Sequence, residues 1–427
     1  MYQIKKLGIG LGMSLGFLFT TSLASCTSAV DPELAFVNEN IEFATAQTQQ
    51  MLQVVGKATP KNYPRTINRE GELVRTSIYD WVPGFFPGTL WYLYELTGDT
   101  LWRAKAEEWT LPMEPVKKMK STHDIGFMMY CSYGNAERLA SQPGYQDILV
   151  ESAKSLCTRF NEKTQTIESW NRRKAWNGNQ WEYPVIIDNM MNLELLTYAS
   201  RVTGDDRYRD IAIRHADTTL KNHFREDHSS YHVVNYDEHT GEVLHRQTCQ
   251  GYSDNSTWAR GQAWAVYGYT MMYRETRKPA YLEAAQQLAD YVIAHLPEDG
   301  VPYWDFNAGQ KGYQPDGKSG ALAFVDVKEQ PRDASAAAVV CSALFELGEF
   351  AQKEAYTRQA IAMLKSLASP AYRAKLGENH HFILMHSTGS IPHQNEIDVP
   401  LNYADYYFVE ALTRYQRLLQ TGKVLKQ

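Results

Sequence analysis

The sequence predicts an all-α protein, an (α/α)6 barrel in which six helical hairpins close into a toroid. Apolar residues recur at the 3.6-residue period of amphipathic helices through most of the chain. Several predicted helices are joined in pairs by similar short turns, such as Glu95-Leu-Thr-Gly-Asp99 and Arg201-Val-Thr-Gly-Asp205. A helical pair repeated with a shared turn indicates an α-hairpin repeat. Closing such hairpins into a ring would leave the inner helices lining a central funnel.

In chain order, the pattern predicts helices at 33–55, 86–97, 100–118, 124–140, 146–162, 185–202, 206–223, 257–275, 279–296, 333–349, 353–368 and 402–420. The long segments between hairpins lie at 60–83, 164–184, 224–256, 297–332 and 370–401. Their unequal lengths disfavour the competing architecture, an open solenoid, because solenoid repeats keep a steadier period. Long loops at one rim of a scaffold are common places for binding and catalysis.

One of these segments also predicts a small β-hairpin. Tyr231–Tyr236 and Glu242–Thr248 flank the turn-forming stretch Asp237–Gly241. No low-complexity linker interrupts the chain, so residues 26–427 are expected to form one barrel domain. Closed barrels often reach such lengths as single units.

The composition is that of a globular protein with an excess of aromatic residues. Apolar residues make up 44% and charged residues 22% of the 427-residue chain. The 27 tyrosines and 10 tryptophans favour stacking on ring-shaped ligands. The net charge of −6 disfavours binding to nucleic acid, which requires a basic surface. An acidic ligand would therefore have to be recognised by a few well-placed cations.

The N-terminal 25 residues are typical of an export signal. Lys5 and Lys6 precede an uncharged apolar run, and Leu23-Ala24-Ser25-Cys26 resembles a bacterial lipoprotein signal. We expect residues 1–25 to be removed and Cys26 to be acylated. The protein would then lie on the periplasmic face of a membrane, the outer membrane being favoured. The alternatives are a plain secretory peptide or an uncleaved anchor, for which the apolar run is short.

Motifs for metals, cofactors and serine nucleophiles are missing from the sequence. Four further cysteines are widely scattered, without C-x-x-C or metal-like spacing. There is no H-E-x-x-H, no P-loop and no G-x-G-x-x-G after a strand. Gly251-Tyr-Ser-Asp-Asn255 does not match the G-x-S-x-G nucleophile elbow. We therefore expect neither a cofactor nor a metal.

The stretch from Gln250 to Trp264 has the residue types that bind a carboxylated sugar. It begins as a polar loop and continues as a helix that carries Trp258, Arg260 and Trp264 in its first turns. Aromatic faces stack on sugar rings, and an arginine fork can hold a carboxylate through two parallel bonds. Alternatively, both tryptophans belong to the core and Arg260 is a surface charge.

Two aspartates lie in apolar surroundings at the starts of predicted helices. Asp124 precedes Ile-Gly-Phe-Met-Met, and Asp188 follows Val-Ile-Ile. Desolvation there would raise a carboxyl pKa and suit the group to proton exchange near neutral pH. The alternative is ordinary helix capping. Histidines that could also take part, although lone histidines are more often structural, are His232, His380, His381 and His393.

Five motifs, read together, resemble those of the unsaturated glucuronyl hydrolases, glycoside hydrolase family 88. They are Trp81–Gly88, His123–Phe127, Ile187–Met191, Gln250–Asp254 and Trp258–Trp264. With Asn402-Tyr-Ala-Asp-Tyr-Tyr407, the resemblance covers nearly the whole chain after the signal. It implies an (α/α)6 barrel that acts on oligosaccharides with a 4,5-unsaturated uronic acid at the non-reducing end. Polysaccharide lyases produce such ends, so a glycosaminoglycan or an ulvan-type polymer is the expected source.

The resemblance also implies a mechanism and a set of roles. The C4=C5 double bond is hydrated, the resulting hemiketal opens, and the uronate leaves as a keto acid. Asp188 would protonate C4 and activate the water that adds at C5, and Asp124 would hold the ring hydroxyls. Four tryptophans would form the stacking walls, namely Trp81, Trp170, Trp258 and Trp264. Contacts to the uronate and the water would come from His232, Gln250 and Arg260. Family members often have a histidine where this chain has Cys249, which bears on the preference for the leaving sugar.

Three other functions remain open at this level. A rhamnogalacturonyl hydrolase would share the fold and the reaction but prefer a rhamnose leaving group. A non-catalytic glycan-binding lipoprotein would use the same aromatic residues, but it would not need two acids in apolar settings. A polysaccharide lyase on the same barrel would instead require a Tyr, His and Arg set.

Overall fold

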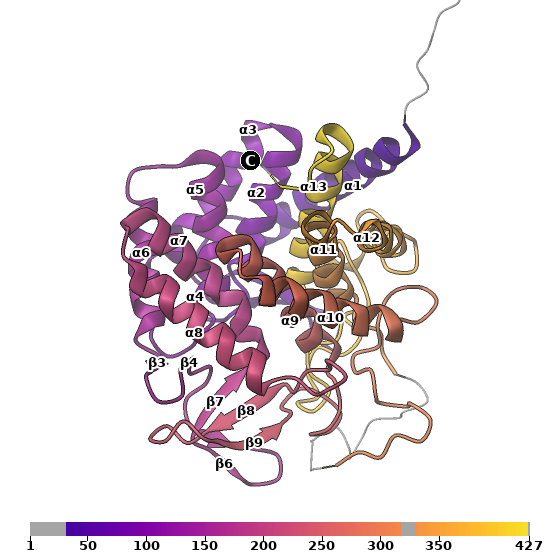
Figure 1. The fold of residues 1–427 in the computed structure, drawn as a ribbon. Helices are drawn as coiled ribbons and strands as arrows, with labels where there is room; N and C mark the ends of the chain where they lie inside the picture. Colours follow the sequence, from indigo (N-terminus) through magenta and orange to yellow (C-terminus); the bar gives the residue numbers. More distant parts are fainter. Residues whose placement is uncertain (1–30, 317–329, 426–427) are drawn as a thin grey trace, which may run out of the picture.

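The computed structural model describes residues 31–316 and 330–425, and Figure 1 shows them as a helical barrel. The predicted signal, residues 1–25, and Cys26 lie outside this part of the chain. The α-helices are α1 (Pro32–Val55), α2 (Phe85–Thr97), α3 (Thr100–Thr110), α4 (Ile125–Met129), α5 (Asn135–Ala140), α6 (Tyr145–Cys157), α7 (Leu193–Thr203), α8 (Asp206–Asn222), α9 (Ala259–Thr276), α10 (Pro279–His295), α11 (Ala334–Ala351), α12 (Glu354–Leu367) and α13 (Asn402–Thr421). Shorter helical segments are η1 (Leu111–Lys118), η2 (Tyr130–Gly134), η3 (Ile187–Asn192) and η5 (Asn379–His381).

The helices form the predicted (α/α)6 barrel. An inner ring runs through α2, the continuous α4–η2–α5 helix, η3–α7, α9, α11 and α13, and α13 contacts α2 to close it. Each inner helix packs against an outer partner, so that α3, α6, α8, α10 and α12 each follow their inner helix in the chain. The exception is α1, which packs on α13 from the other end of the sequence. This closure rules out the open solenoid.

The shared turns that predicted the hairpins have a common physical basis. Gly98 and Gly204 end α2 and α7 in the left-handed conformation, with φ of 68° and 71°. A glycine adopts this conformation without the clash that a Cβ would cause. The next residue in each turn, Asp99 or Asp205, then caps the following helix through its side chain. Each turn therefore ends one helix and starts its partner.

The inner helices are buried on nearly every side. α11 is buried from Ala334 to Gly348, and it is the one helix within the described residues that is long and apolar enough to cross a membrane. Its most apolar window is 83% buried inside the barrel, which is the environment of a core helix. A helix enclosed in this way has no polar face, so its sequence is apolar all round.

Short strands collect at one end of the barrel (Figure 1). The predicted hairpin is present as β8 (Val233–Tyr236) and β9 (Val243–Gln247). A third strand, β7 (Tyr183–Ile186), pairs antiparallel with β8 and was not predicted; it includes residues 185 and 186, where the sequence predicted the start of the helix at 185–202. Two-stranded ribbons complete the set, with strands β1 (Tyr63–Ile67), β2 (Leu73–Thr76), β3 (Phe160–Asn161), β4 (Thr166–Ile167), β5 (Arg173–Lys174) and β6 (Gln180–Trp181).

Candidate active site

A cleft opens at the end of the barrel where the inner helices begin. The empty space between its walls, including the part open to solvent, is about 390 Å³. Its walls come from the starts of α4, η3 and α9 and from the loops before them. The lining residues are Trp81, His123, Asp124, Trp170, Ile186, Asp188, Gln250, Trp258 and Arg260. Asp124 and Asp188, the two acids singled out in the sequence, thus face the same space.

Strand β7 places Asp188. The strand ends at Ile186, and η3 begins at the next residue. The Ile187 N–H donates to the His232 carbonyl at 3.1 Å, which continues the β7–β8 pairing to the edge of the cleft. Helix α9 then packs directly on η3 at Gly261, where an added Cβ would lie 3.2 Å from Ile187. Sheet and helix together fix the position of the Asp188 backbone.

The Asp188 carboxyl is buried and incompletely hydrogen-bonded. Its side chain is 13% exposed, and Oδ1 has no hydrogen-bond partner in the described part of the chain. Burial raises the pKa of Asp188 to about 7, and the nearby charge of Arg260 partly opposes this rise. Asp188 makes no helix-capping bond. A carboxyl in this state can both give and take a proton near neutral pH.

His232 faces Asp188 as a neutral hydrogen-bond donor. Its Nδ1 accepts the backbone N–H groups of Cys249 and Gln250, each at 3.1 Å. The proton of the neutral ring must therefore be on Nε2, which lies 3.7 Å from Asp188 Oδ1. Burial, with a contribution from Arg260, lowers the pKa of His232 well below its usual value. The Nε2–H group and the carboxyl are too far apart for a direct hydrogen bond, so both remain available to a ligand.

A parallel arrangement holds Asp124. Asn192, on η3, accepts the Phe127 N–H through Oδ1, so its amide nitrogen faces His123 Nδ1 at 3.3 Å as a donor. The His123 proton is thereby placed on Nε2, 3.3 Å from Asp124 Oδ1. Thr122 donates its hydroxyl to the other carboxylate oxygen at 2.6 Å. Asp124 stands at the N-cap position of α4 but makes no capping bond, so the capping interpretation is wrong for both acids.

The structure changes the interpretation of Arg260. This residue lines the cleft, but its guanidinium is buried and already bound to protein. It forms an ion pair with Asp333 at 2.8 Å and donates to the Thr388 and Gly389 carbonyls. The predicted two-bond fork for a ligand carboxylate is therefore used largely within the protein. What Arg260 provides to the cleft is a fixed positive charge above the Trp258 ring, 4.4 Å from its centroid.

The four predicted tryptophans occupy different depths. Trp81, Trp170 and Trp258 line the cleft, but Trp258 is only 2% exposed and packs on the His232 ring at 4.5 Å between centroids, so the predicted stacking role does not hold for it. Trp264 is fully buried beneath them, so it has no face open for stacking. Its Nε1–H lacks a hydrogen-bond partner, yet it lies near enough to Asp188 to lower the pKa of that carboxyl. Trp264 is therefore placed as a polar contact of the acid, whereas the sequence suggested a stacking wall.

Gln250 links the floor of the cleft to its rim. Its backbone N–H binds His232, and its side-chain amide donates to the Gly389 carbonyl at 3.2 Å. Burial raises the pKa of the neighbouring Cys249 thiol to about 12, so this side chain stays neutral. His380 and His381 lie away from the cleft on η5, and His393 lies at its rim, with Nδ1 2.6 Å from Ser390 Oγ.

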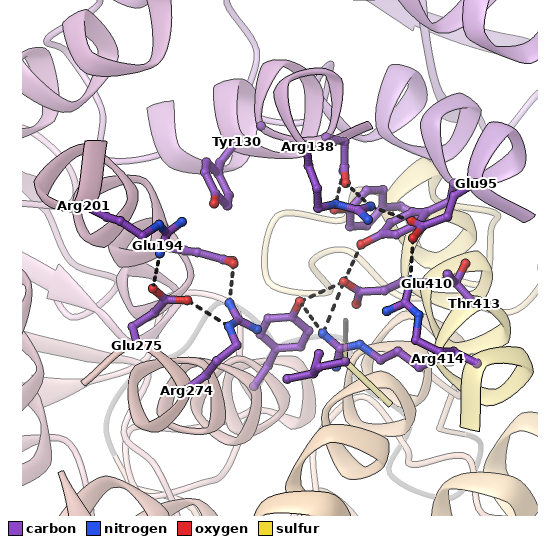
Figure 2. A pocket seen from close by; sticks show the side chains of 17 residues that line it. Glu95, Tyr130, Arg138, Glu194, Arg201, Arg274, Glu275, Glu410, Thr413 and Arg414 are labelled. Carbon is purple, nitrogen blue, oxygen red and sulfur yellow. Dashed lines mark hydrogen bonds and ion pairs between the residues drawn. The ribbon is translucent and has the colours of Figure 1, made fainter. Parts of the chain in front are cut away.

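A larger cavity lies toward the other ends of the inner helices, with about 1120 Å³ of empty space including the part open to solvent. Figure 2 shows the side chains that line it. Five arginines and four glutamates line it, but each of these carboxylates lies within ion-pair distance of an arginine. Burial raises the pKa of Glu194 to about 7, as it does for Asp188. Arg274 contacts that carboxyl directly, however, so this cavity offers no unpartnered acid. The chemistry is accordingly assigned to the cleft.

Several known proteins resemble this chain over most of its length. Residues 53–272 match the model of Glycosyl Hydrolase Family 88. An unsaturated glucuronyl hydrolase of Formosa agariphila is 45% identical, over 90% of this chain and 96% of its own. An unsaturated chondroitin disaccharide hydrolase of Streptococcus pyogenes is 30% identical, over 84% and 86% of the two chains. The crystal structure of an unsaturated glucuronyl hydrolase specific for heparin is 42% identical, with a TM-score of 0.82, and covers 92% of this chain and 100% of its own.

Proposed function

Because this chain belongs to glycoside hydrolase family 88 and is a hydrolase of unsaturated uronyl oligosaccharides, we propose that Asp188 is its catalytic acid and base. The main support for this assignment is that Asp188 Oδ1 is buried, has no hydrogen-bond partner in the described residues and lies opposite the His232 Nε2–H. A buried polar atom without a partner in a cleft is one that a ligand or water completes. The substrate is a short oligosaccharide with a 4,5-unsaturated uronic acid at its non-reducing end.

In the proposed reaction, the protonated Asp188 carboxyl gives its proton to C4 of the double bond. Water adds at C5, and its surplus proton returns to the Asp188 carboxylate, so the enzyme is regenerated. The product carries a new C4–H bond and a new C5–OH bond. The C5 hemiketal then opens by breaking the bond to the ring oxygen, and the resulting hemiacetal at C1 releases the leaving sugar. One water is consumed in each turnover, and no cofactor is required.

The surrounding residues set up this proton transfer. The Nε2–H of His232 lies 3.7 Å from the carboxyl, and the Trp264 Nε1–H is close enough to lower its pKa, while both donors remain without a partner in the described residues. Fixed donors of this kind cost no reorganisation when charge develops in a transition state. Asp124, held by the Thr122 hydroxyl and with His123 Nε2 3.3 Å away, is placed to accept hydrogen bonds from ring hydroxyls. Trp81 and Trp170 supply the apolar walls against which the flat ring can rest, whereas Trp258 is only 2% exposed and offers little open surface.

The polymer from which the substrate comes is proposed from similarity. The relatives include one structure described as specific for heparin and one chondroitin disaccharide hydrolase. We infer that this enzyme acts on glycosaminoglycan-derived disaccharides. Ulvan-derived substrates and a rhamnose leaving group are the alternatives that a substrate panel would decide between.

The test follows the conjugated double bond, whose ultraviolet absorbance is lost on hydration. The protein is incubated with lyase-made disaccharides from glycosaminoglycans, ulvan and pectin. We expect Asp188→Asn to lower kcat by about 10²–10⁴-fold on the best substrate, the usual range for a general acid–base group. Asp147→Asn, on the distant helix α6, is the matched control and should behave as the parent. Turnover of any substrate by Asp188→Asn at the parental rate would refute the assignment.

We also propose that the mature protein is held at the periplasmic face of a membrane by lipid on Cys26. The support is the sequence of the first 26 residues, with two lysines, an apolar run and Leu-Ala-Ser-Cys. Cys26→Ala should move the enzyme from the membrane fraction to the soluble fraction of cells. Equal membrane association of parent and variant would contradict acylation at this residue.

A further inference from the structure

We propose that the β5–β6 hairpin at the mouth of the cleft binds an anionic group on the sugar that follows the unsaturated uronate, with Arg173 as the contact. The anion would be a sulfate or a carboxylate. This inference rests on the proposed function, because it extends the same cleft by one sugar. It assigns a specificity-determining role to a residue that the sequence motifs do not include.

The hairpin places Arg173 beside a wall of the cleft. Arg173 and Trp181 are cross-strand partners, so their side chains lie on the same face of the ribbon. The Arg173 guanidinium lies over the Trp170 ring, 4.9 Å from its centroid, and 5.9 Å from that of Trp181. Trp170 lines the cleft itself. A guanidinium stacked in this way keeps its N–H groups at its edges, where an anion can bind them.

Within the part of the chain that the structure describes, the charge of Arg173 is not neutralised. Its neighbour Arg172 is paired with Glu182, whereas neither Arg173 nor Lys174 has a carboxylate within ion-pair distance in the described residues. Both side chains are exposed. The charge of Arg173 nevertheless reaches the cleft, because it contributes to the lowered pKa values of both His232 and His393. Arg173 is therefore a cation without a carboxylate partner in the described residues, and it lies at the mouth of the cleft.

The tip of the hairpin supplies a surface for a sugar ring. Trp176 is 38% exposed, and its Nε1–H donates to the Cys249 carbonyl at 2.9 Å, which fixes the tip to the loop before Gln250. The Trp176 ring also contacts His393, with 4.9 Å between centroids. The mouth of the cleft is thus bordered by an aromatic face, a histidine and a free cation. This combination fits a charged sugar, since the ring can stack while its anion meets the guanidinium.

An anionic glycan fits this place better than a nucleic acid or an acidic protein. The chain as a whole carries a net charge of −6, so it would repel an extended polyanion. Arg173 and Lys174, which have no carboxylate within ion-pair distance in the described residues, both lie on one short ribbon next to the cleft. A single sulfate or carboxylate on the sugar next to the uronate would lie close to the Arg173 charge. The remainder of the oligosaccharide would lie away from it.

The test compares matched unsaturated disaccharides whose second sugar is unmodified, sulfated or carboxylated. We expect Arg173→Gln to raise KM for a sulfated or carboxylated substrate about ten- to hundredfold more than for the unmodified one, as for loss of a charge-assisted hydrogen bond. The arm that shows the larger rise identifies the anion. Added salt should narrow the difference between parent and variant. Arg172→Gln removes the same charge from the adjacent, paired position and is the matched control.

Each outcome has a distinct meaning. If Arg173→Gln changes the kinetics equally on all three substrates, Arg173 acts through His232 and not through an anion on the substrate. This result would overturn the proposal. An unchanged KM on every substrate would overturn it as well. If the parent enzyme hydrates none of the unsaturated disaccharides, the proposed function itself fails, and this result is separate from any effect of Arg173.

Discussion

The Nε2 atom of His232 lies 3.7 Å from Oδ1 of Asp188, and neither atom has a hydrogen-bond partner in the described part of the protein. Two buried groups of matching character are thus held slightly too far apart to satisfy each other. Unsatisfied buried groups cost free energy, and they persist where a ligand completes them. This separation leaves room for a substrate atom or a water to bridge the pair.

The first prediction concerns the protonation of His232. Because Nδ1 accepts two backbone N–H groups, we expect a neutral ring with its proton on Nε2 throughout pH 6–8. Nitrogen NMR of the histidine side chains would identify this tautomer directly. The exposed ring of His239 is the internal reference, because its side chain is 85% exposed and no backbone N–H holds it. A His232 ring that titrates in this range, or one protonated on Nδ1, would contradict the arrangement.

The second prediction concerns stability and pH. Burial raises the pKa of Asp188 from 3.8 to about 7, so the folded protein holds a proton that the unfolded chain has lost. The stabilisation from this proton is complete below pH 4 and is lost as the pH rises towards 7. Asp188→Asn removes the ionisable group. We therefore expect the free energy of unfolding of the variant to rise relative to that of the parent as the pH increases, by a few kcal/mol at about pH 8.

Unfolding followed by calorimetry at pH 4 and pH 8 tests this expectation. Asp147→Asn, at an exposed position on α6, should show no such pH-dependent gain. A difference between Asp188→Asn and the parent that stays constant with pH would mean that Asp188 is not desolvated in the free enzyme. Burial of Asp188 would then not lower the stability of the protein at high pH, as the raised pKa requires.

The third prediction concerns Gly126, which lets α4 approach η3. A Cβ at this position would lie 2.5 Å from the Asn192 Cα, and backbone atoms cannot give way as a flexible side chain can. Gly126→Ala should therefore destabilise the protein by about 1–3 kcal/mol, as overpacking does. It should also lower activity, because Asn192 holds the His123 ring next to Asp124 in the cleft. Chemical denaturation and the hydration assay measure the two effects.

Gly71→Ala serves as the comparison, since no atom lies within 4 Å of its Cβ position and only the positive φ of 79° opposes the change. This variant should lose stability by about 1 kcal/mol and keep its activity. If Gly126→Ala has the stability of the parent, the helices are not in the close contact described.

The sequence predicted the barrel well because its evidence was local. Helical periodicity and the Thr-Gly-Asp turns depend on neighbouring residues, and the α4–η2–α5 helix ends at Ala140, where the pattern ended. Strand β7 was missed, since four apolar residues directly before a helical segment resemble the start of that helix until β8 pairs with them. Helix α6 ends at Cys157, although the pattern extended it to residue 162.

The sequence predicted most of the residues of the candidate site, but it did not predict which of them contact one another. Asp124 and Asp188 stood out because charges beside apolar residues are rare. The partners of Arg260 could not be foreseen, because Asp333 and Gly389 come from distant loops that meet it only in the folded barrel. His123 and Asn192 lie within or beside the motifs, but spacing alone does not reveal that one orients the other. An unpartnered Arg173 likewise requires the fold.

The fourth prediction separates the charge of Arg260 from its contacts. This charge lowers the pKa of Asp188, while its N–H groups hold Asp333 and the Gly389 carbonyl. Arg260→Met removes both, so the Asp188 pKa should rise and the alkaline limb of kcat should move to higher pH. Arg260→Lys keeps the positive charge, so the alkaline limb of kcat should stay near pH 7. It loses the several N–H donors of the guanidinium, so the loop that carries Gly389 should be held less firmly and KM should increase. Full pH–rate profiles of the parent and both variants, with circular dichroism to confirm folding, make the comparison. An alkaline limb that lies at the same pH in all three proteins would show that Asp188 is not the group whose protonation controls the rate.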